Sequence, residues 1–155
     1  MKVLLVVDVQ NGFMKNDKYK ELSNKIDEYI AKSNYDKIIF TKFINDKLKN
    51  PLYQDRMSWG KLTTEAQQEF SVKVPPNAIV MEKYGYGLTR ENLDYIDSLK
   101  VNEIDVCGLE SEACVYAVAL QLWDMGIYPN ILAKYIEGDF DMKEIFIKNF
   151  GNITI

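Results

Sequence analysis

Short apolar runs that alternate with amphipathic helical patterns constrain this chain more than any other feature. Several runs lack the polar alternation of a strand with one wet face, as is typical of parallel strands buried on both sides. Five runs rich in Val and Ile have strand length and are bounded by turn signals: 2–7, 37–43, 78–82, 103–107 and 127–133. Apolar residues spaced by three and four predict helices between them, over 18–32, 89–99, 112–125 and 142–150. This alternation predicts a Rossmann-like, three-layer α/β/α sandwich around a mostly parallel sheet.

Local signals mark some of the element boundaries. Thr89 is a candidate N-cap for the helix that follows it, and Gly126 is placed to end the helix before it. Residues 153–155 are a candidate edge strand. The segment 45–71 is less regular, and we expect a long loop with one short helix there.

Length and charge narrow the class of protein. The 155 residues fit one domain, 1–155, and the net charge of −4 argues against a nucleic-acid partner. No apolar run approaches the roughly 18 residues that span a bilayer, and the apolar N-terminal stretch is too short for a secretory signal. Two cysteines cannot form a disulfide framework, so the expected location is the cytoplasm.

The chain contains no histidine. This excludes Ser-His-Asp and Cys-His catalysis and removes the commonest nitrogen ligand of zinc and iron. We therefore expect no transition metal and no cofactor, and acid–base chemistry must use Asp, Glu, Lys, Cys or Tyr.

Three reactive side chains follow predicted strands. Asp8 ends the first strand, Lys83 follows the third, and Cys114 comes after the fourth, near a helix start. Because the carboxyl ends of parallel strands share one edge of a sheet, we expect the three side chains to meet there.

The three residue types together suit nucleophilic catalysis. A helix N-terminus and a nearby ammonium both favour a thiolate, so we expect the Cys114 thiol to have a pKa below the usual value of about 8.5. Asp8 opposes this effect, because a nearby carboxylate disfavours a second negative charge, and the titrations of Asp8 and Cys114 are therefore coupled. The aspartate can take the thiol proton and later return it to a leaving amine, while N–H groups at the helix start can hold the oxyanion.

Each residue also has a purely structural interpretation. Cys107 lies inside an apolar strand and is expected to be a core residue. Asp8 can cap the turn after its strand, and Lys83 can be a solvated strand end. Tyr84 and Tyr86, which flank a glycine, can simply pack over a turn.

Three motifs together resemble the isochorismatase-like cysteine hydrolases: VVDVQNGF at 6–13, MEKYGYG at 81–87 and CGLESEACVYAVALQLWDMGI at 107–127. The resemblance implies a parallel sheet between helices and makes Asp8, Lys83 and Cys114 an Asp-Lys-Cys triad. It also implies a cis peptide between Leu109 and Glu110 and backbone donors to the oxyanion in that region, including Ala113. Members of the family are often homo-oligomers, so we expect one here.

The chain departs from the family pattern in the segment after the second predicted strand. Nicotinamidases of the family hold a metal through an aspartate and histidines after the second strand, where this chain reads TKFINDKLKN, without histidine. We therefore carry over no metal site. The presence of Cys114 favours hydrolysis of the C–N bond of a small amide-like substrate through a thioester. The expected pocket walls are Phe13, Trp59, Tyr84 and Tyr86.

Other functions stay open on the sequence. One alternative is vinyl-ether hydrolysis of an isochorismate-like acid, in which Asp8 acts as the acid and Cys114 is not needed. Another is a binding protein that keeps the fold without turnover. A flavodoxin-like cofactor binder is disfavoured, since no glycine-rich phosphate loop follows the first strand.

Overall fold

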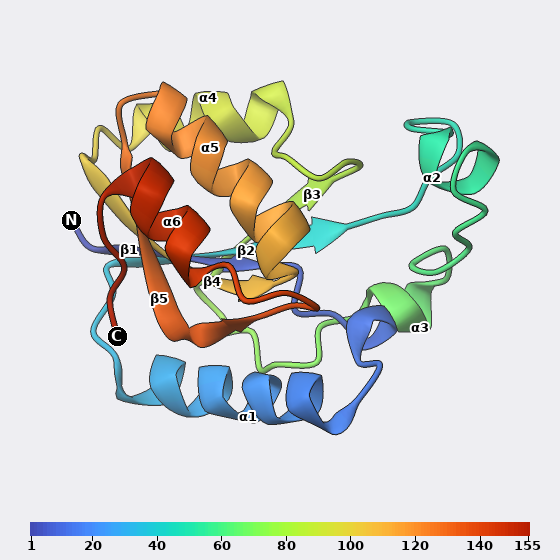
Figure 1. Ribbon diagram of the computed structural model, residues 1–155, viewed down its shortest axis with the longest axis horizontal. Coiled ribbons are helices and arrows are strands. Elements are labelled where there is room, and N and C mark those ends of the chain that lie inside the picture. The colour runs from blue at the N-terminus through green and yellow to red at the C-terminus, as the bar shows by residue number, and fades with distance from the viewer.

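A five-stranded sheet forms the centre of the structure, a computed structural model that describes all 155 residues (Figure 1). All neighbouring strands are parallel, in the order β3-β2-β1-β4-β5. The strands are β1 (Val3–Val7), β2 (Lys37–Phe43), β3 (Ile79–Lys83), β4 (Glu103–Leu109) and β5 (Tyr128–Glu137). The order runs outward from β1 through β2 to β3 and then returns to place β4 on the other side of β1. That reversal creates the crevice where ligands of open α/β sheets bind.

Helices cover both faces of the sheet, so the predicted three-layer α/β/α sandwich is confirmed. Figure 1 shows α1 (Asp17–Lys32) alone below the sheet. Above it lie α4 (Arg90–Ser98), α5 (Tyr116–Asp124) and α6 (Lys143–Phe150).

The alternation of side chains along β1 explains why both faces are buried. Val3, Leu5 and Val7 belong to the core beneath α4, α5 and α6, whereas Leu4 and Val6 belong to the core against α1. Every β1 residue is therefore buried, which is the reason for the continuous apolar run.

The predicted helix boundaries hold at two caps. The Thr89 side chain accepts a hydrogen bond from the backbone N–H of Asn92 at 3.2 Å. Gly126 follows α5 with φ +77°, a backbone conformation that glycine adopts without strain.

The predicted helix 112–125 is divided in the structure. It begins as a π-helical turn, η2 (Ser111–Val115), which continues into α5. The two strands before and after it are longer than predicted, because Gly108 and Leu109 pair with Ile136 and Glu137. Gly108 also lies so close to β1 that a side chain there would collide with the Val7 carbonyl.

The irregular segment 45–71 contains two short helices, α2 (Leu52–Asp55) and α3 (Glu65–Gln68), so the prediction of one is wrong. In Figure 1 the β2 arrow points toward α2, and the segment therefore extends beyond the carboxyl ends of the strands. A further turn, η1 (Asn11–Phe13), follows β1. The candidate edge strand at 153–155 is present only as a single parallel bridge between Leu132 and Thr154.

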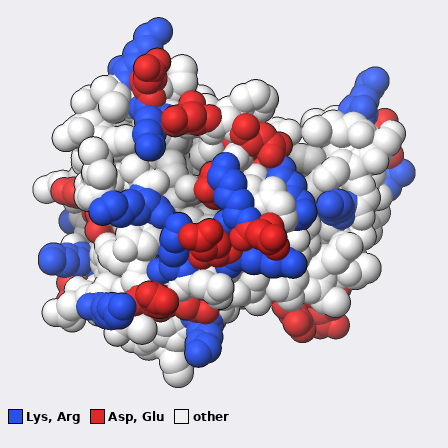
Figure 2. All heavy atoms as spheres, turned by 60° about the horizontal axis from the view of Figure 1, so that its bottom comes forward, with Lys and Arg blue, Asp and Glu red and all other residues white.

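Charges of both signs mix on the surface around α1, as Figure 2 shows. Two such pairs lie along the helix, Glu21 with Lys25 at 2.8 Å and Glu28 with Lys32 at 3.7 Å. None of the helices has the length and apolar character of a membrane span.

Candidate active site

Asp8 lies directly after β1, at the point where the strand order reverses. It is fully buried and has a φ of +50°, which is uncommon for a residue with a side chain. Thr41 holds this conformation: its hydroxyl accepts from the Asp8 backbone N–H at 3.0 Å and donates to Asp8 Oδ1 at 2.6 Å. The carboxylate is therefore oriented by the neighbouring strand.

Lys83 brings a buried positive charge to the same place. Its Nζ lies 2.8 Å from Asp8 Oδ2, and both side chains have no exposed surface. The ammonium also donates to the carbonyls of Gly85 at 2.6 Å and Tyr86 at 3.1 Å. Burial alone lowers the pKa of Lys83, but the charges and hydrogen bonds of Asp8 and Cys114 outweigh it and raise the pKa above its usual value. The ammonium is therefore a permanent charge of the site.

Cys114 lies in η2, where its side chain is 6% exposed. Burial raises the pKa of the thiol, Asp8 raises it further, and Lys83 opposes both effects. The expectation of a pKa below the usual value is wrong for the resting protein, because the loss of hydration exceeds the stabilisation that one ammonium provides. The proton stays on sulfur until a base removes it.

The peptide bond between Leu109 and Glu110 is cis. Leu109 is buried in the sheet, whereas Glu110 and Ala113 line the cavity in front of Cys114. The N–H groups of Ala113 and Val115 both donate to the Glu110 carbonyl, at 3.1 and 3.0 Å. The Ala113 N–H, expected as an oxyanion donor, is therefore already engaged.

The cavity that Cys114 enters has a volume of about 320 Å³. Its walls are mostly hydrophobic, and their aromatic residues come from η1, the end of β2, the segment around α2 and the turn after β3. The lining residues include Phe13, Phe43, Tyr53, Met57, Trp59 and Tyr86. Phe13 stacks on Trp59 with ring centroids 6.1 Å apart and planes inclined by 28°.

Three of the four predicted wall residues line this cavity, and Tyr84 does not. The Tyr84 hydroxyl donates to Glu82 Oε2 at 3.1 Å, and the Lys49 ammonium lies 5.5 Å from its ring centroid. The interpretation of Tyr84 as a pocket wall is therefore wrong, because its side chain contacts Glu82 and Lys49 instead of the cavity.

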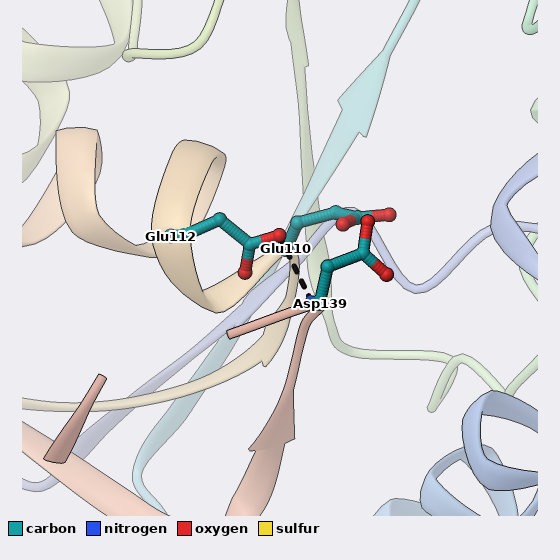
Figure 3. Close-up of side chains that lie close together, drawn as sticks. All are labelled: Glu110, Glu112 and Asp139. Carbon is teal, nitrogen blue, oxygen red and sulfur yellow. Dashed lines mark hydrogen bonds between the residues drawn. The ribbon is translucent and has the colours of Figure 1, made fainter. Parts of the chain in front are cut away.

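Acidic residues gather at the cavity rim. Figure 3 shows Glu110, Glu112 and Asp139 close together, with oxygens within 4.8 Å of one another. Their oxygens already have partners in the protein. Lys15 Nζ lies 2.7 Å from Asp139 and 3.6 Å from Glu110, and Glu112 accepts from the Asp139 backbone N–H at 3.0 Å. The Tyr19 hydroxyl donates to Glu110 at 3.0 Å. The cluster therefore ties the loop after β5 to the cavity rim.

The segment after β2 offers no set of ligands suited to zinc. Asn45 donates its amide to the carbonyls of Trp59 at 3.0 Å and Lys61 at 2.9 Å, and its side-chain oxygen accepts from Gln54 at 3.3 Å. This side chain is fully used in holding the loop, and Phe43 occupies the cavity wall beside it. The residues present do not fit the metal site of the nicotinamidases.

Sequence reasoning missed three residues that shape this site: Thr41, Phe43 and Tyr53. A hydroxyl residue inside the apolar run IIFTKF was an available signal for Thr41. Phe43 and Tyr53 carry no such signal, because an aromatic residue in a strand or loop is equally consistent with an ordinary core.

We expect Thr41→Val to lower both stability and activity. The change leaves the buried N–H and one carboxylate oxygen of Asp8 without their partner, at a cost of about 1–3 kcal/mol in the free energy of unfolding. Thr41→Ser keeps the hydroxyl and is the control. Urea unfolding checks the stability, and equal behaviour of the two variants would show that the hydroxyl does not hold Asp8.

Comparison with known proteins bears on the fold and the family. The Isochorismatase domain model matches residues 2–134. A search of curated protein sequences finds no match.

Similar solved structures cover nearly the whole chain. A pyrazinamidase/nicotinamidase of Streptococcus mutans has a TM-score of 0.84 at 15% identity, covering 100% of both chains. Pyrazinamidase of Pyrococcus horikoshii, in complex with zinc, has 0.80 at 21% identity and covers 99% of this chain and 98% of its own. N-carbamoylsarcosine amidase of Thermoplasma acidophilum has 0.78 at 19% identity, covering 99% and 95%. These structures share the fold, and the domain match together with the sheet and helices described above shows that the chain belongs to the isochorismatase family of hydrolases.

Proposed function

We propose that the protein hydrolyses a small amide through a thioester on Cys114. The observation that carries the proposal is the buried Asp8–Lys83 pair beside the only thiol that lines the aromatic cavity. Amidases among the similar structures support the same reaction class. The substrate is a small molecule, since the cavity measures about 320 Å³.

Asp8 serves as the base. Its Oδ2 faces the Lys83 ammonium at 2.8 Å and has no further donor in the protein, so it retains a site for a proton. It takes the thiol proton as sulfur attacks the carbonyl carbon, and it then gives that proton to the nitrogen as the C–N bond breaks. An amine or ammonia leaves, and the acyl group stays on sulfur.

Water completes the cycle. Asp8 takes a proton from the water that attacks the thioester, the C–S bond breaks, and the sulfur recovers its proton as the acid departs. Lys83 stays charged throughout and balances the negative charge that moves between Asp8, sulfur and the oxyanion.

The alternative of vinyl-ether hydrolysis requires Asp8 as an acid. That reaction does not need a thiol, whereas here the buried Asp8–Lys83 ion pair lies beside Cys114, which lines the cavity. The thiol beside the ion pair therefore favours amide chemistry.

Acyl transfer to hydroxylamine tests the proposal. A panel of small primary amides is incubated with the protein and hydroxylamine, and a thioester intermediate yields the hydroxamic acid in place of part of the carboxylic acid. Mass spectrometry of acid-quenched protein should find the acyl group on the peptide that contains Cys114. Turnover of an isochorismate-like acid without turnover of any amide would overturn the proposal, and absence of both would indicate a binding protein.

We expect alkylation of Cys114 to depend on pH as for a thiol of raised pKa. Labelling by iodoacetamide should be slow at pH 7 and keep rising through pH 9, where an ordinary thiol approaches its plateau. Lys83→Met removes the one charge that lowers this pKa and should slow labelling further. Cys107, which is fully buried in β4, is the internal control and should stay unlabelled in the folded protein. A plateau below pH 8 would show a preformed thiolate.

A further inference from the structure

The turn after β3, residues 84–88, is held by side chains alone. None of its backbone groups is hydrogen-bonded to another backbone group. Asn50 donates to its first carbonyl at 2.9 Å, Lys83 donates to the next two carbonyls, and Gln121 binds its last residue. The shape of the turn therefore depends on these three side chains.

The Gln121 side chain makes a two-point contact with Leu88. Its Oε1 accepts from the Leu88 backbone N–H at 2.7 Å, and its Nε2 donates to the Leu88 carbonyl at 3.1 Å. The amide also packs against Gly87, where an added Cβ would come within 2.9 Å of Oε1, Cδ and Nε2. Gly87 does not adopt the left-handed conformation, so a glycine is needed there for space and not for its backbone angles.

Gln121 belongs to the same helical stretch as the nucleophile. Cys114 lies in η2, which continues into α5, and Gln121 follows about two turns further along. Leu88 packs into the same core as Cys114. One helix therefore positions both the thiol and the far end of the turn.

The two carbonyls in the middle of this turn fix the Lys83 ammonium. Gly85 and Tyr86 accept from Nζ at 2.6 and 3.1 Å, and Asp8 Oδ2 lies 2.8 Å from the same atom. Because the Lys83 side chain has no exposed surface, losing these acceptors would leave a buried charge with fewer partners, so the ammonium would move or admit water. A displaced turn would thus displace the positive charge of the site.

We propose that Gln121 is a positioning residue, which fixes the turn 84–88 and thereby keeps the Lys83 ammonium beside the thiol. Gln121 acts through the turn and does not line the cavity. The inference deepens the proposed hydrolysis, and only its kinetic consequence rests on that proposal.

Exchange of the Lys83 ammonium protons with water tests this role without any substrate. Nuclear magnetic resonance of protein labelled with ¹⁵N-lysine detects protected ammonium groups at mildly acid pH, and Lys83→Met assigns the signal. The test variant is Gln121→Ala, which removes both hydrogen bonds to Leu88 and places a good helix former in α5. The control is Asn130→Ala, which also removes two side-chain hydrogen bonds, near the amino end of β5.

We expect Gln121→Ala to accelerate the exchange of the Lys83 protons about tenfold, because two hydrogen bonds that keep the turn closed are lost. Asn130→Ala should leave this exchange nearly unchanged. The inference is overturned if Gln121→Ala has no effect, if both variants accelerate the exchange equally, or if the wild type shows no protected Lys83 signal.

A second variant disturbs the same contact from the side of the turn and leaves α5 unchanged. Gly87→Ala should displace the Gln121 amide and accelerate the exchange to a similar extent. The double variant Gly87→Ala/Gln121→Ala should exchange no faster than Gln121→Ala, because no amide remains to be displaced. Full addition of the two effects would show that the changes act independently and would also overturn the inference.

Turnover is measured separately, on the best amide of the panel. Gln121→Ala should reduce kcat about tenfold, and by more than it changes KM, since a displaced ammonium matters most while negative charge develops in the site. Faster exchange with an unchanged kcat would overturn the positioning role. Faster exchange in the variant, without hydrolysis of any amide by the wild type, would refute the proposed function alone.

Discussion

Replacing Cys114 with alanine is expected to reduce amide hydrolysis by roughly 10³-fold or more, because Cys114 is the only thiol that lines the cavity. Cys107→Ala is the matched control, since it removes the only other thiol of the chain. Cys107 is fully buried on the α1 side of the sheet, whereas Cys114 lies on the opposite side. The control should therefore lose some stability through lost packing and retain turnover.

Initial rates on the best amide of the panel, with circular dichroism to verify folding, distinguish the two variants. Cys114→Ser adds a second comparison, because a hydroxyl in the same position is a much weaker nucleophile. Substantial residual amide hydrolysis in folded Cys114→Ala would contradict the thioester mechanism.

Asp8→Asn is expected to abolish turnover and to destabilise the fold by about 3–5 kcal/mol, the usual cost of leaving one partner of a buried ion pair without its counter-charge. The Lys83 ammonium would then retain carbonyl partners only. In this variant burial lowers the pKa of Lys83 without the opposing effect of Asp8. The unfolded state binds the extra proton, so the stability of the variant should rise with pH as Lys83 becomes neutral in the fold.

The double variant Asp8→Asn/Lys83→Met separates stability from catalysis. It replaces the ion pair with neutral groups of similar size, and we expect most of the lost stability to return while activity stays absent. Urea unfolding of the wild type, both single variants and the double variant between pH 6 and 10 measures the coupling. If the double variant lost as much stability as the two single variants lose together, the buried pair would make no energetic contribution as a pair.

The residues at the ends of strands were predictable because they depend on local patterns. Continuous apolar runs predict buried parallel strands, and parallel strands end at a common edge. The structure accordingly places Asp8 and Lys83 in contact with each other and both close enough to Cys114 to shift the pKa of its thiol. The segment around α2 escaped prediction, since its short helices form against the cavity rather than through a periodic pattern of their own.

Sequence alone determined the α/β/α layers, the parallel strands and the three reactive residue types at one edge of the sheet, because period and strand ends are properties of neighbouring residues. Only the tertiary structure decided that Phe43 and Tyr53 close the cavity while Tyr84 lies outside it, since those contacts join segments distant in the chain. It also decided that the Cys114 proton stays on sulfur. The physical reason is desolvation: a pKa depends on how much water the surrounding fold excludes, and the local sequence does not contain that quantity.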